Sequence, residues 1–268
     1  MIGVIGGTGL YKIDGIENVI SKKVETPYGT PSADVTLGEL CGQRVAFLPR
    51  HGSSHQILPS EINFRANIWA LKSVGVRRII SVSAVGSLRK EICPGDLALP
   101  NQYLDYTKGK RAGTFFGEGI VAHVSTAHPS CATLAQEIEQ EAESLKTSVH
   151  SEKTYGCVEG PRLGTRAESL FLRQSGCDLV GMTNVPEVFL AREAQLCYCT
   201  IAVATDYDCW LDDPKEHATV EKVIELYYKN IGRVQELLKK IVGRNETHLA
   251  CECRSSLKFA VLTKEESL

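Results

Sequence analysis

The stretch CYCTIAVATDYDCW, residues 197–210, starts as an apolar run and then presents two aspartates, Asp206 and Asp208. An uncharged run rich in β-branched and aromatic residues predicts a buried strand over 197–206. In open α/β sheets, ligands bind beyond the carboxyl ends of the strands. The two carboxylates that follow this strand are therefore the first candidates for a functional site.

The rest of the chain alternates between strand and helix patterns. Strands are predicted at residues 3–6, in a hairpin over 35–50, and at 77–87, 119–126, 153–160 and 178–183. Helices are predicted at 61–76, 130–146, 165–176 and 214–242, and Asn184 with Glu187 has the spacing of a capping box for a further helix. This alternation predicts an α/β fold, a single domain with a central mixed β-sheet flanked by helices.

Composition supports one enzyme-like domain. The chain has 268 residues, 43% of them hydrophobic, and a net charge of −2. No basic face is expected, which argues against a nucleic-acid partner. No apolar run approaches the length of about 18 residues that a membrane span needs, and the N-terminus lacks the basic region of a signal peptide. A cytoplasmic location is therefore expected, with a domain over 1–243 and a tail over 244–268 that packs on it.

Ten cysteines are present, and none forms a CxxC pair. Zinc ribbons and fingers use that spacing twice, so the pattern predicts no structural metal. Cys251 and Cys253 form a CxC pair in the polar tail. Two interpretations stay open for it, two exposed thiols or a disulfide that the cytosol normally keeps reduced.

The predicted strand ends carry a set of residues of which the hydroxyl-bearing and basic ones suit an anion. The set is Thr8, Arg50, His51, Ser83, Ala84, Met182 and Thr183. The glycine turn before Gly9 is not GxGxxG and lacks an acidic ribose reader, so it suits a single phosphate better than a dinucleotide. An arginine fork matches two phosphate oxygens, and a hydroxyl ahead of a helix N-terminus lies where anions are attracted.

Asp206 and Asp208 are two positions apart, and in extended backbone such residues point to the same side. Two close carboxylates tend to raise the pKa of one of them, so that group could keep a proton at neutral pH and serve as a general acid. The alternative is a loop in which each aspartate caps a local turn.

Several segments together carry a family resemblance. They are GVIGGTGLY (3–11), TPYGTPSADVTLG (26–38), AFLPRHG (46–52), NFRANIWALKSVGV (63–76), SAVGSLR (83–89), PGDLALPNQYLD (94–105), VEGPR (158–162), TRAES (165–169), GMTNVPE (181–187) and ATDYDCW (204–210). In this combination and order the chain resembles the methylthioadenosine phosphorylases of the trimeric purine nucleoside phosphorylase family.

The resemblance implies a phosphorolysis, in which inorganic phosphate attacks C1′ of a purine nucleoside through an oxocarbenium-like state. It implies that phosphate is bound by Thr8, Arg50, His51, Ser83, Ala84 through its backbone, and Thr183. Met182 then packs against the ribose. Asp206 approaches purine N7 and Asp208 approaches the 6-substituent, as the catalytic pair. No cofactor is implied, because phosphate is a co-substrate.

Substrate choice follows from the same residues. A carboxylate only accepts hydrogen bonds, so Asp208 favours a 6-amino purine. Val220, Val223 and Ile224 stand where relatives that prefer a 5′-hydroxyl place a histidine, and an apolar wall there favours a methylthio group. The predicted substrate is 5′-methylthioadenosine. The alternatives are a broader or 6-oxopurine nucleoside phosphorylase, and a ligand-binding α/β protein without this activity.

Two further points concern assembly and a departure from the family pattern. His123 matches a residue that reaches the neighbouring subunit's site, which implies a homotrimer, alone or as a dimer of trimers. Leu163 stands in the substrate site where the family usually has an aromatic residue that stacks on the base. Stacking contributes about 0.5–1.5 kcal/mol beyond area burial, so weaker affinity or a wider pocket is expected.

Overall fold

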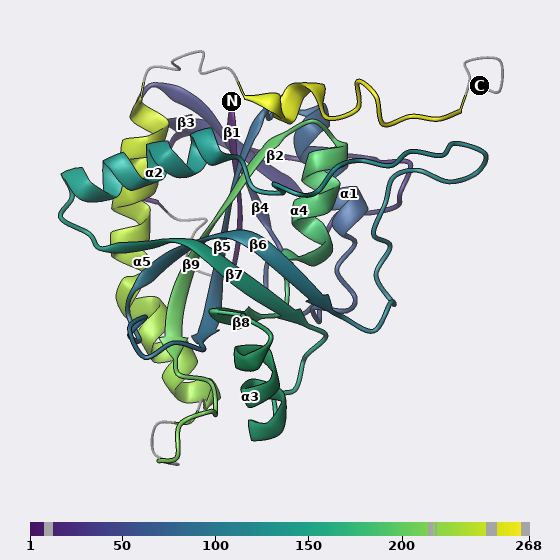
Figure 1. The fold of residues 1–268 in the computed structure, drawn as a ribbon. Coiled ribbons are helices and arrows are strands. Elements are labelled where there is room, and N and C mark those ends of the chain that lie inside the picture. Colours follow the sequence, from purple (N-terminus) through teal and green to yellow (C-terminus); the bar gives the residue numbers. More distant parts are fainter. Residues whose placement is uncertain (8–12, 214–216, 218, 245–250, 264–268) are drawn as a thin grey trace.

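The computed structural model describes residues 1–7, 13–213, 217, 219–244 and 251–263 (Figure 1). The strands are β1 Ile2–Gly6, β2 Glu17–Lys22, β3 Val35–Leu40, β4 Gln43–Pro49, β5 Arg78–Ser87, β6 Leu97–Tyr106, β7 Val149–Val158, β8 Leu179–Gly181 and β9 Cys197–Asp206. The helices are α1 Phe64–Ser73, α2 Ala132–Ser144, α3 Arg166–Gln174, α4 Asn184–Glu193, α5 Val220–Gly243 and the short 3₁₀ helix η2 Glu252–Ser255. The predicted α/β class is confirmed.

The strands form one mixed nine-stranded sheet in the order β2-β3-β4-β1-β5-β8-β7-β6-β9, and β9 also pairs with β5. This second pairing closes β5, β8, β7, β6 and β9 into a ring. β4, β1, β5 and β9 run parallel to one another, so their carboxyl ends point the same way. Every residue of β9 is buried, as expected for a strand covered on both faces.

Helices cover both faces of the parallel strands. α2 and α5 pack together on one side, and α1 and α4 pack together on the other, as Figure 1 shows. Each pair encloses its own apolar cluster. One cluster joins β1 and β4 to α2 and α5, and the other joins the opposite faces of these strands to α1 and α4. Alternate side chains of the strands thus pack into the helices on the two faces of the sheet. The helices cover these faces but not the carboxyl edge, where a ligand could bind.

Several predicted elements differ from the structure. The segment 119–126 is not a strand, because its pairing consists of isolated bridges, one of which joins Ala122 to Val261 of the tail. The long helix begins at Val220 rather than 214, with Thr219 as its side-chain cap. β2 and β6 were not predicted. A helix does follow residue 183, but Thr183 is its N-cap, with no side-chain capping bond.

The tail lies against the same body. Gln195 donates to the carbonyl of Arg254 at 2.7 Å, and the Ser256 hydroxyl donates to the carbonyl of Arg192 at 2.7 Å. The division at residue 243 stays a prediction. Among the described residues, none of the helices has both the length and the apolar character that crossing a membrane requires.

Candidate functional site

The carboxyl ends of the parallel strands meet at one edge, as predicted. Gly6 of β1 pairs with Pro49 of β4, and the amide of Arg50 donates to the Gly6 carbonyl at 3.0 Å. On the other side of β1, Gly86 of β5 pairs with Asp206 of β9. Arg50 and His51 therefore lie at the same edge as the aspartates, but nearer the middle of β5.

β8 reaches this edge from the opposite direction. It pairs antiparallel with β5, with Val180 opposite Gly86, so the chain then runs back along β5 toward Ser83. The Ser83 hydroxyl lies 3.2 Å from Asn184 Oδ1, to which it donates. Thr183, which is buried at the N-terminus of α4, is thereby held beside Ser83. Ser83 thus lies beside Asn184, the residue that follows Thr183, although β8 is not one of the parallel strands.

Arg50 is almost completely buried and is tied to an unexpected partner. Its Nε and Nη2 donate to the two carboxylate oxygens of Glu187 at 2.8 and 2.9 Å, and Nη1 donates to the Val82 carbonyl at 3.0 Å. Burial alone lowers the pKa of Arg50, but the Glu187 carboxylate outweighs it and the net pKa is raised. Glu187 was predicted to cap a helix. Instead it neutralises a buried cation, which needs a charged partner more than a helix end needs a cap.

The environment of His51 favours a neutral imidazole at neutral pH. Burial lowers its pKa to about 4, and its Nδ1 lies 2.9 Å from the Ile57 carbonyl. A carbonyl only accepts, so Nδ1 carries the hydrogen and Nε2 keeps its lone pair. The ring also stacks on His55 with centroids 4.4 Å apart. His51 can thus accept a hydrogen bond from a protonated phosphate oxygen.

Asp206 and Asp208 are both buried at the end of β9. A methyl group at Gly86 would lie 3.1 Å from Asp206 Oδ1 and 3.1 Å from Asp208 Cβ, so both aspartates face β5. The extended geometry predicted for the pair is wrong. The chain turns at Asp208, which has φ 51°, and its amide donates to Asp206 Oδ1 at 2.7 Å. Asp206 therefore caps this turn and also faces the site.

The protonation of the pair follows from burial. Burial is the main cause that raises the pKa of Asp206, and hydrogen bonds from Thr205 and the Asp208 amide partly offset it. Burial also raises the pKa of Asp208. Each carboxyl holds its proton more firmly than in water. The arrangement can therefore supply a proton donor beside an acceptor of hydrogen bonds.

Arg111 connects two loops at this edge, and the sequence reasoning missed it. Its Nη1 donates to the carbonyls of Met182 and Val185, both at 2.7 Å, and its Nε donates to Glu159 at 2.9 Å. A lone arginine in a long loop gives no local signal of such a role. Met182 also packs against Gly160, whose missing side chain leaves room for the thioether. Arg111 thus fixes the segment that carries Met182 and Thr183.

The remaining predicted residues lie around this edge or outside the described part of the chain. Thr8 lies outside the described residues. Leu163 is 42% exposed, Val220 and Ile224 are exposed, and Val223 is half-buried. Lys222, in the same first turn of α5, opposes the rise in the pKa of Asp206, so this turn lies near the pair.

Ala84 is half-buried and pairs with Val203 of β9, as its place on β5 requires. His123 is exposed and its amide donates to the Ala260 carbonyl at 2.8 Å. It lies in the long connection between β6 and α2, which extends away from the sheet in Figure 1. Within the described part of the chain, no hydrogen bond joins the His123 side chain to the aspartate pair.

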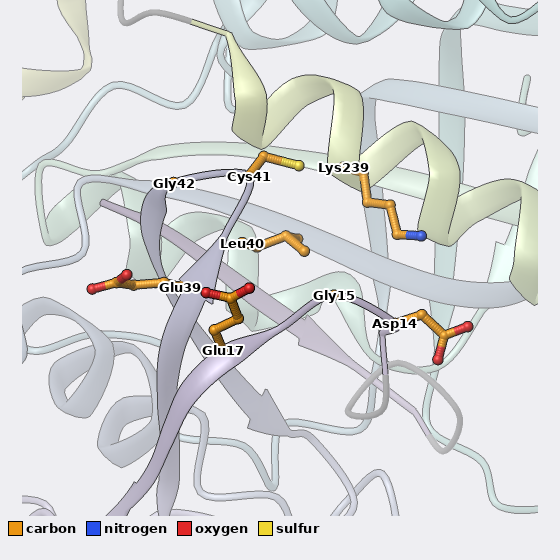
Figure 2. Close-up of a pocket in the computed structure, with 8 residues that line it drawn as sticks. All are labelled: Asp14, Gly15, Glu17, Glu39, Leu40, Cys41, Gly42 and Lys239. Carbon is orange, nitrogen blue, oxygen red and sulfur yellow. The ribbon is translucent and has the colours of Figure 1, made fainter.

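A pocket of about 360 Å³ lies elsewhere, between the β2–β3 region and α5 (Figure 2). It is lined by Asp14, Gly15, Glu17, Glu39, Leu40, Cys41, Gly42 and Lys239. None of the predicted site residues belongs to it. Its three carboxylates outnumber the single lysine, so the pocket repels an anion such as phosphate. The carboxyl edge of the sheet is therefore the better candidate for a phosphate-using site.

Comparison with known proteins identifies relatives over the whole chain. The model of the phosphorylase superfamily matches residues 1–243. An S-methyl-5′-thioadenosine phosphorylase of Hyperthermus butylicus is 51% identical over 265 residues, which are 97% of this chain and 95% of that protein. An S-methyl-5′-thioadenosine phosphorylase of Geobacter sulfurreducens is 46% identical over 268 residues, 100% of this chain and 93% of that protein.

Solved structures agree with these relatives. The crystal structure of a methylthioadenosine phosphorylase from an antarctic soil metagenomic library superposes with a TM-score of 0.91 at 43% identity, covering 100% of this chain and 94% of the other. A methylthioadenosine phosphorylase from Schistosoma mansoni in complex with adenine superposes with a TM-score of 0.90 at 36% identity, covering 100% and 99% of the two chains. The similarity thus includes the whole sheet and the candidate site.

Proposed function

Because the chain belongs to the phosphorylase superfamily, we propose that it cleaves the N-glycosidic bond of 5′-methylthioadenosine with inorganic phosphate. The products are adenine and 5-methylthioribose 1-phosphate, and the enzyme class is a pentosyltransferase of the purine nucleoside phosphorylase type. The observation that carries the proposal is the buried Asp206–Asp208 pair at the same edge as Ser83 and Thr183.

The spacing along β5 suits a nucleoside with phosphate at one end. Arg50 bonds to the Val82 carbonyl, whereas the aspartates lie against Gly86. Four residues of strand span about 13 Å at 3.3 Å per residue, which is enough for a ribose between a phosphate and a purine. Met182 lies on the returning segment between these two ends, where it can pack against the sugar.

The phosphate end combines a cation with hydroxyl groups and a helix N-terminus. Ser83 and Thr183 provide hydroxyls, α4 provides its positive end, and the Ala84 backbone adjoins them. Arg50 keeps its charge beneath this region through Glu187. His51 accepts from a protonated phosphate oxygen. The phosphate oxygen that stays unprotonated is then free to attack C1′.

At the purine end, departure of the base leaves electron density on the ring. A proton at N7 makes the base a better leaving group, and Asp206 is the carboxyl placed to donate it. Its raised pKa increases the protonated fraction near neutral pH. Asp208 accepts from the 6-amino group, which is how the site selects adenine over a 6-oxopurine. No cofactor enters this scheme.

The same proposal includes assembly and cellular role. A homotrimer, alone or paired as a dimer of trimers, would let His123 of one subunit complete the site of its neighbour, and Val220, Val223 and Ile224 would surround the methylthio group. The reaction fits purine and methionine salvage in the cytoplasm. Support comes from the exposure of His123 and of the first turn of α5 in the single chain, since such groups remain available to a neighbour.

Adenine release from purified protein tests the proposal. Methylthioadenosine should yield adenine only when phosphate is added, and the ratio of adenine to sugar phosphate should be one. Comparing methylthioadenosine, methylthioinosine, adenosine and inosine then decides the purine preference. Adenine release that is equally fast without phosphate contradicts the proposal, and faster turnover of inosine contradicts the role of Asp208.

A further inference from the structure

Four cysteines from three distant segments meet in the interior. Cys131 is the N-cap of α2, Cys197 is the first residue of β9, and Cys251 and Cys253 lie at the start of η2. Their Sγ atoms all lie within 4.8 Å of one another, and those of Cys197 and Cys251 are 3.4 Å apart. Three of the four side chains are buried and Cys251 is half-buried. The exposed-thiol interpretation of the CxC pair is therefore wrong for Cys253.

We propose that Cys131, Cys197, Cys251 and Cys253 bind one Zn²⁺ ion as a structural tetrathiolate site. A tetrahedron with Zn–S bonds of about 2.3 Å has sulfur atoms about 3.8 Å apart. The sulfur atoms of Cys197 and Cys251 are 3.4 Å apart and no pair is more than 4.8 Å apart, so rotations of the side chains can bring all four to this length. Four protein ligands fill the coordination sphere, which makes the site closed and structural rather than catalytic.

The surroundings suit the charge of such a site. Four thiolates around a divalent cation carry two excess negative charges. Arg192 Nη1 lies 3.6 Å from Cys253 Sγ, and Cys131 lies at the positive N-terminal end of a 13-residue helix. The amide of Cys131 donates to the Tyr198 carbonyl at 2.8 Å, which ties this ligand to the strand that carries Cys197. Arg192 and the N-terminal end of α2 thus oppose the excess negative charge, and the bond to β9 fixes the position of Cys131.

Metal binding also balances chemically without another reactant. Four thiols release four protons to solvent as Zn²⁺ binds, and no electron is transferred. Two disulfides from the same four thiols would release four electrons and would require an oxidant. The sequence predicted no structural metal because it lacks CxxC pairs. That argument applies only to ligands close together in sequence, whereas here only Cys251 and Cys253 are close and the other two come from distant segments.

The site would anchor the tail, and this role does not depend on the proposed reaction. After η2 the tail pairs with the loop before α2. The Ala260 carbonyl accepts from the amide of His123 at 2.8 Å, and the amide of Leu262 donates to the Val121 carbonyl at 2.9 Å. A metal that holds Cys251 and Cys253 thus also braces the loop that carries His123.

Metal content of the intact chain tests the proposal. Protein expressed without an affinity tag that binds metals, in zinc-supplemented medium, and purified under reducing conditions, should contain about one zinc per chain by mass spectrometry of the metal. Cobalt substitution should give the visible absorption of tetrahedral Co²⁺ with thiolate charge-transfer bands. Cys131→Ser and Cys253→Ser should lose the zinc. Cys93→Ser, which is exposed, and Cys177→Ser, which is buried in another cluster, should retain it.

A measurement on the unmodified chain guards against variants that fail to fold. Chelation should accelerate proteolytic cleavage in the tail by about tenfold or more, and added zinc should reverse it. Wild-type protein that contains no zinc and gives no tetrahedral cobalt spectrum would overturn the proposal. Loss of four hydrogens by intact mass without bound zinc, which indicates two disulfides, would overturn it as well.

Discussion

Arg50 and Glu187 form a two-point ion pair in the core, although 137 residues separate them in sequence. The guanidinium and the carboxylate meet at 2.8 and 2.9 Å, and neither side chain is more than 2% exposed. This pair links the end of β4 to the first turns of α4. It therefore holds a cation beneath the position proposed for phosphate.

Glu187→Gln should lower the free energy of unfolding by about 3–5 kcal/mol, because it leaves the buried guanidinium uncompensated. Phosphate should then stabilise the variant more than the wild type, since the anion restores the missing charge. Thermal unfolding with and without phosphate measures both effects. Glu236→Gln removes a more exposed pair with Lys239 and should cost no more than about 1 kcal/mol. Equal losses in the two variants would contradict a special role for Arg50–Glu187.

Asp206→Ala should lower kcat by about 10²–10⁴-fold, because it removes the proposed proton donor. Asp208→Asn should lower kcat less and should increase the relative rate on 6-oxopurine nucleosides, since an amide can donate to the oxygen. Steady-state rates on methylthioadenosine and inosine measure these changes. An Asp206→Ala enzyme with wild-type kcat would show that the leaving base takes its proton elsewhere.

The pH profile of kcat should report the same carboxyl. Burial raises the pKa of Asp206, so the protonated form persists above the usual carboxyl range and is lost as pH rises through the raised value. Wild-type kcat should therefore fall on the alkaline side of that pKa. The residual rate of Asp206→Ala should not show this limb. Values of kcat measured across the pH range in buffers of constant ionic strength provide the test.

His51 should make stability depend on pH. Its pKa is lowered from 6.5 to about 4, so between these values the unfolded chain binds a proton that the folded chain does not. The stability that depends on a neutral, buried His51 is therefore fully present above pH 6.5. It is lost as pH falls toward 4, which lowers the free energy of unfolding by at most about 3 kcal/mol. Urea unfolding in phosphate-free buffer should show a flatter dependence over this range for His51→Asn. Parallel curves for the two proteins would contradict the assignment.

Arg111→Met should raise the KM for the nucleoside and lower the free energy of unfolding by about 1–3 kcal/mol, because the carbonyls of Met182 and Val185 lose a buried donor. Arg166→Met is the matched control, since Arg166 pairs with Asp212 in the solvent. A KM change in Arg166→Met as large as in Arg111→Met would argue against a positioning role for Arg111.

Leu163→Phe should lower the KM for methylthioadenosine by about two- to tenfold, the equivalent of 0.5–1.5 kcal/mol of stacking on the purine. Leu163 is 42% exposed, so the loop has room for a ring. Leu170→Phe changes a similarly exposed leucine on α3 and should leave the KM unchanged. A higher KM for Leu163→Phe would show that the pocket is already filled.

The sequence by itself determined the features that depend on neighbouring residues. The apolar run 197–204 predicted β9, because a strand covered on both faces needs apolar side chains throughout, and the structure buries all of it. The same local pattern placed Asp206 and Asp208 beyond a carboxyl end. Family motifs then indicated the phosphorylase superfamily, which comparison confirmed.

Only the tertiary structure decided the features that join distant segments. It reversed β8 so that Asn184, next to Thr183, bonds to Ser83, paired Glu187 with Arg50 rather than with a helix end, and brought Arg111 to the Met182 carbonyl. It also gathered four cysteines that share no metal-binding spacing. Spacing along the chain describes contacts within a strand or a helix turn, whereas these partners are chosen by packing and by the need of buried charges and thiols for one another.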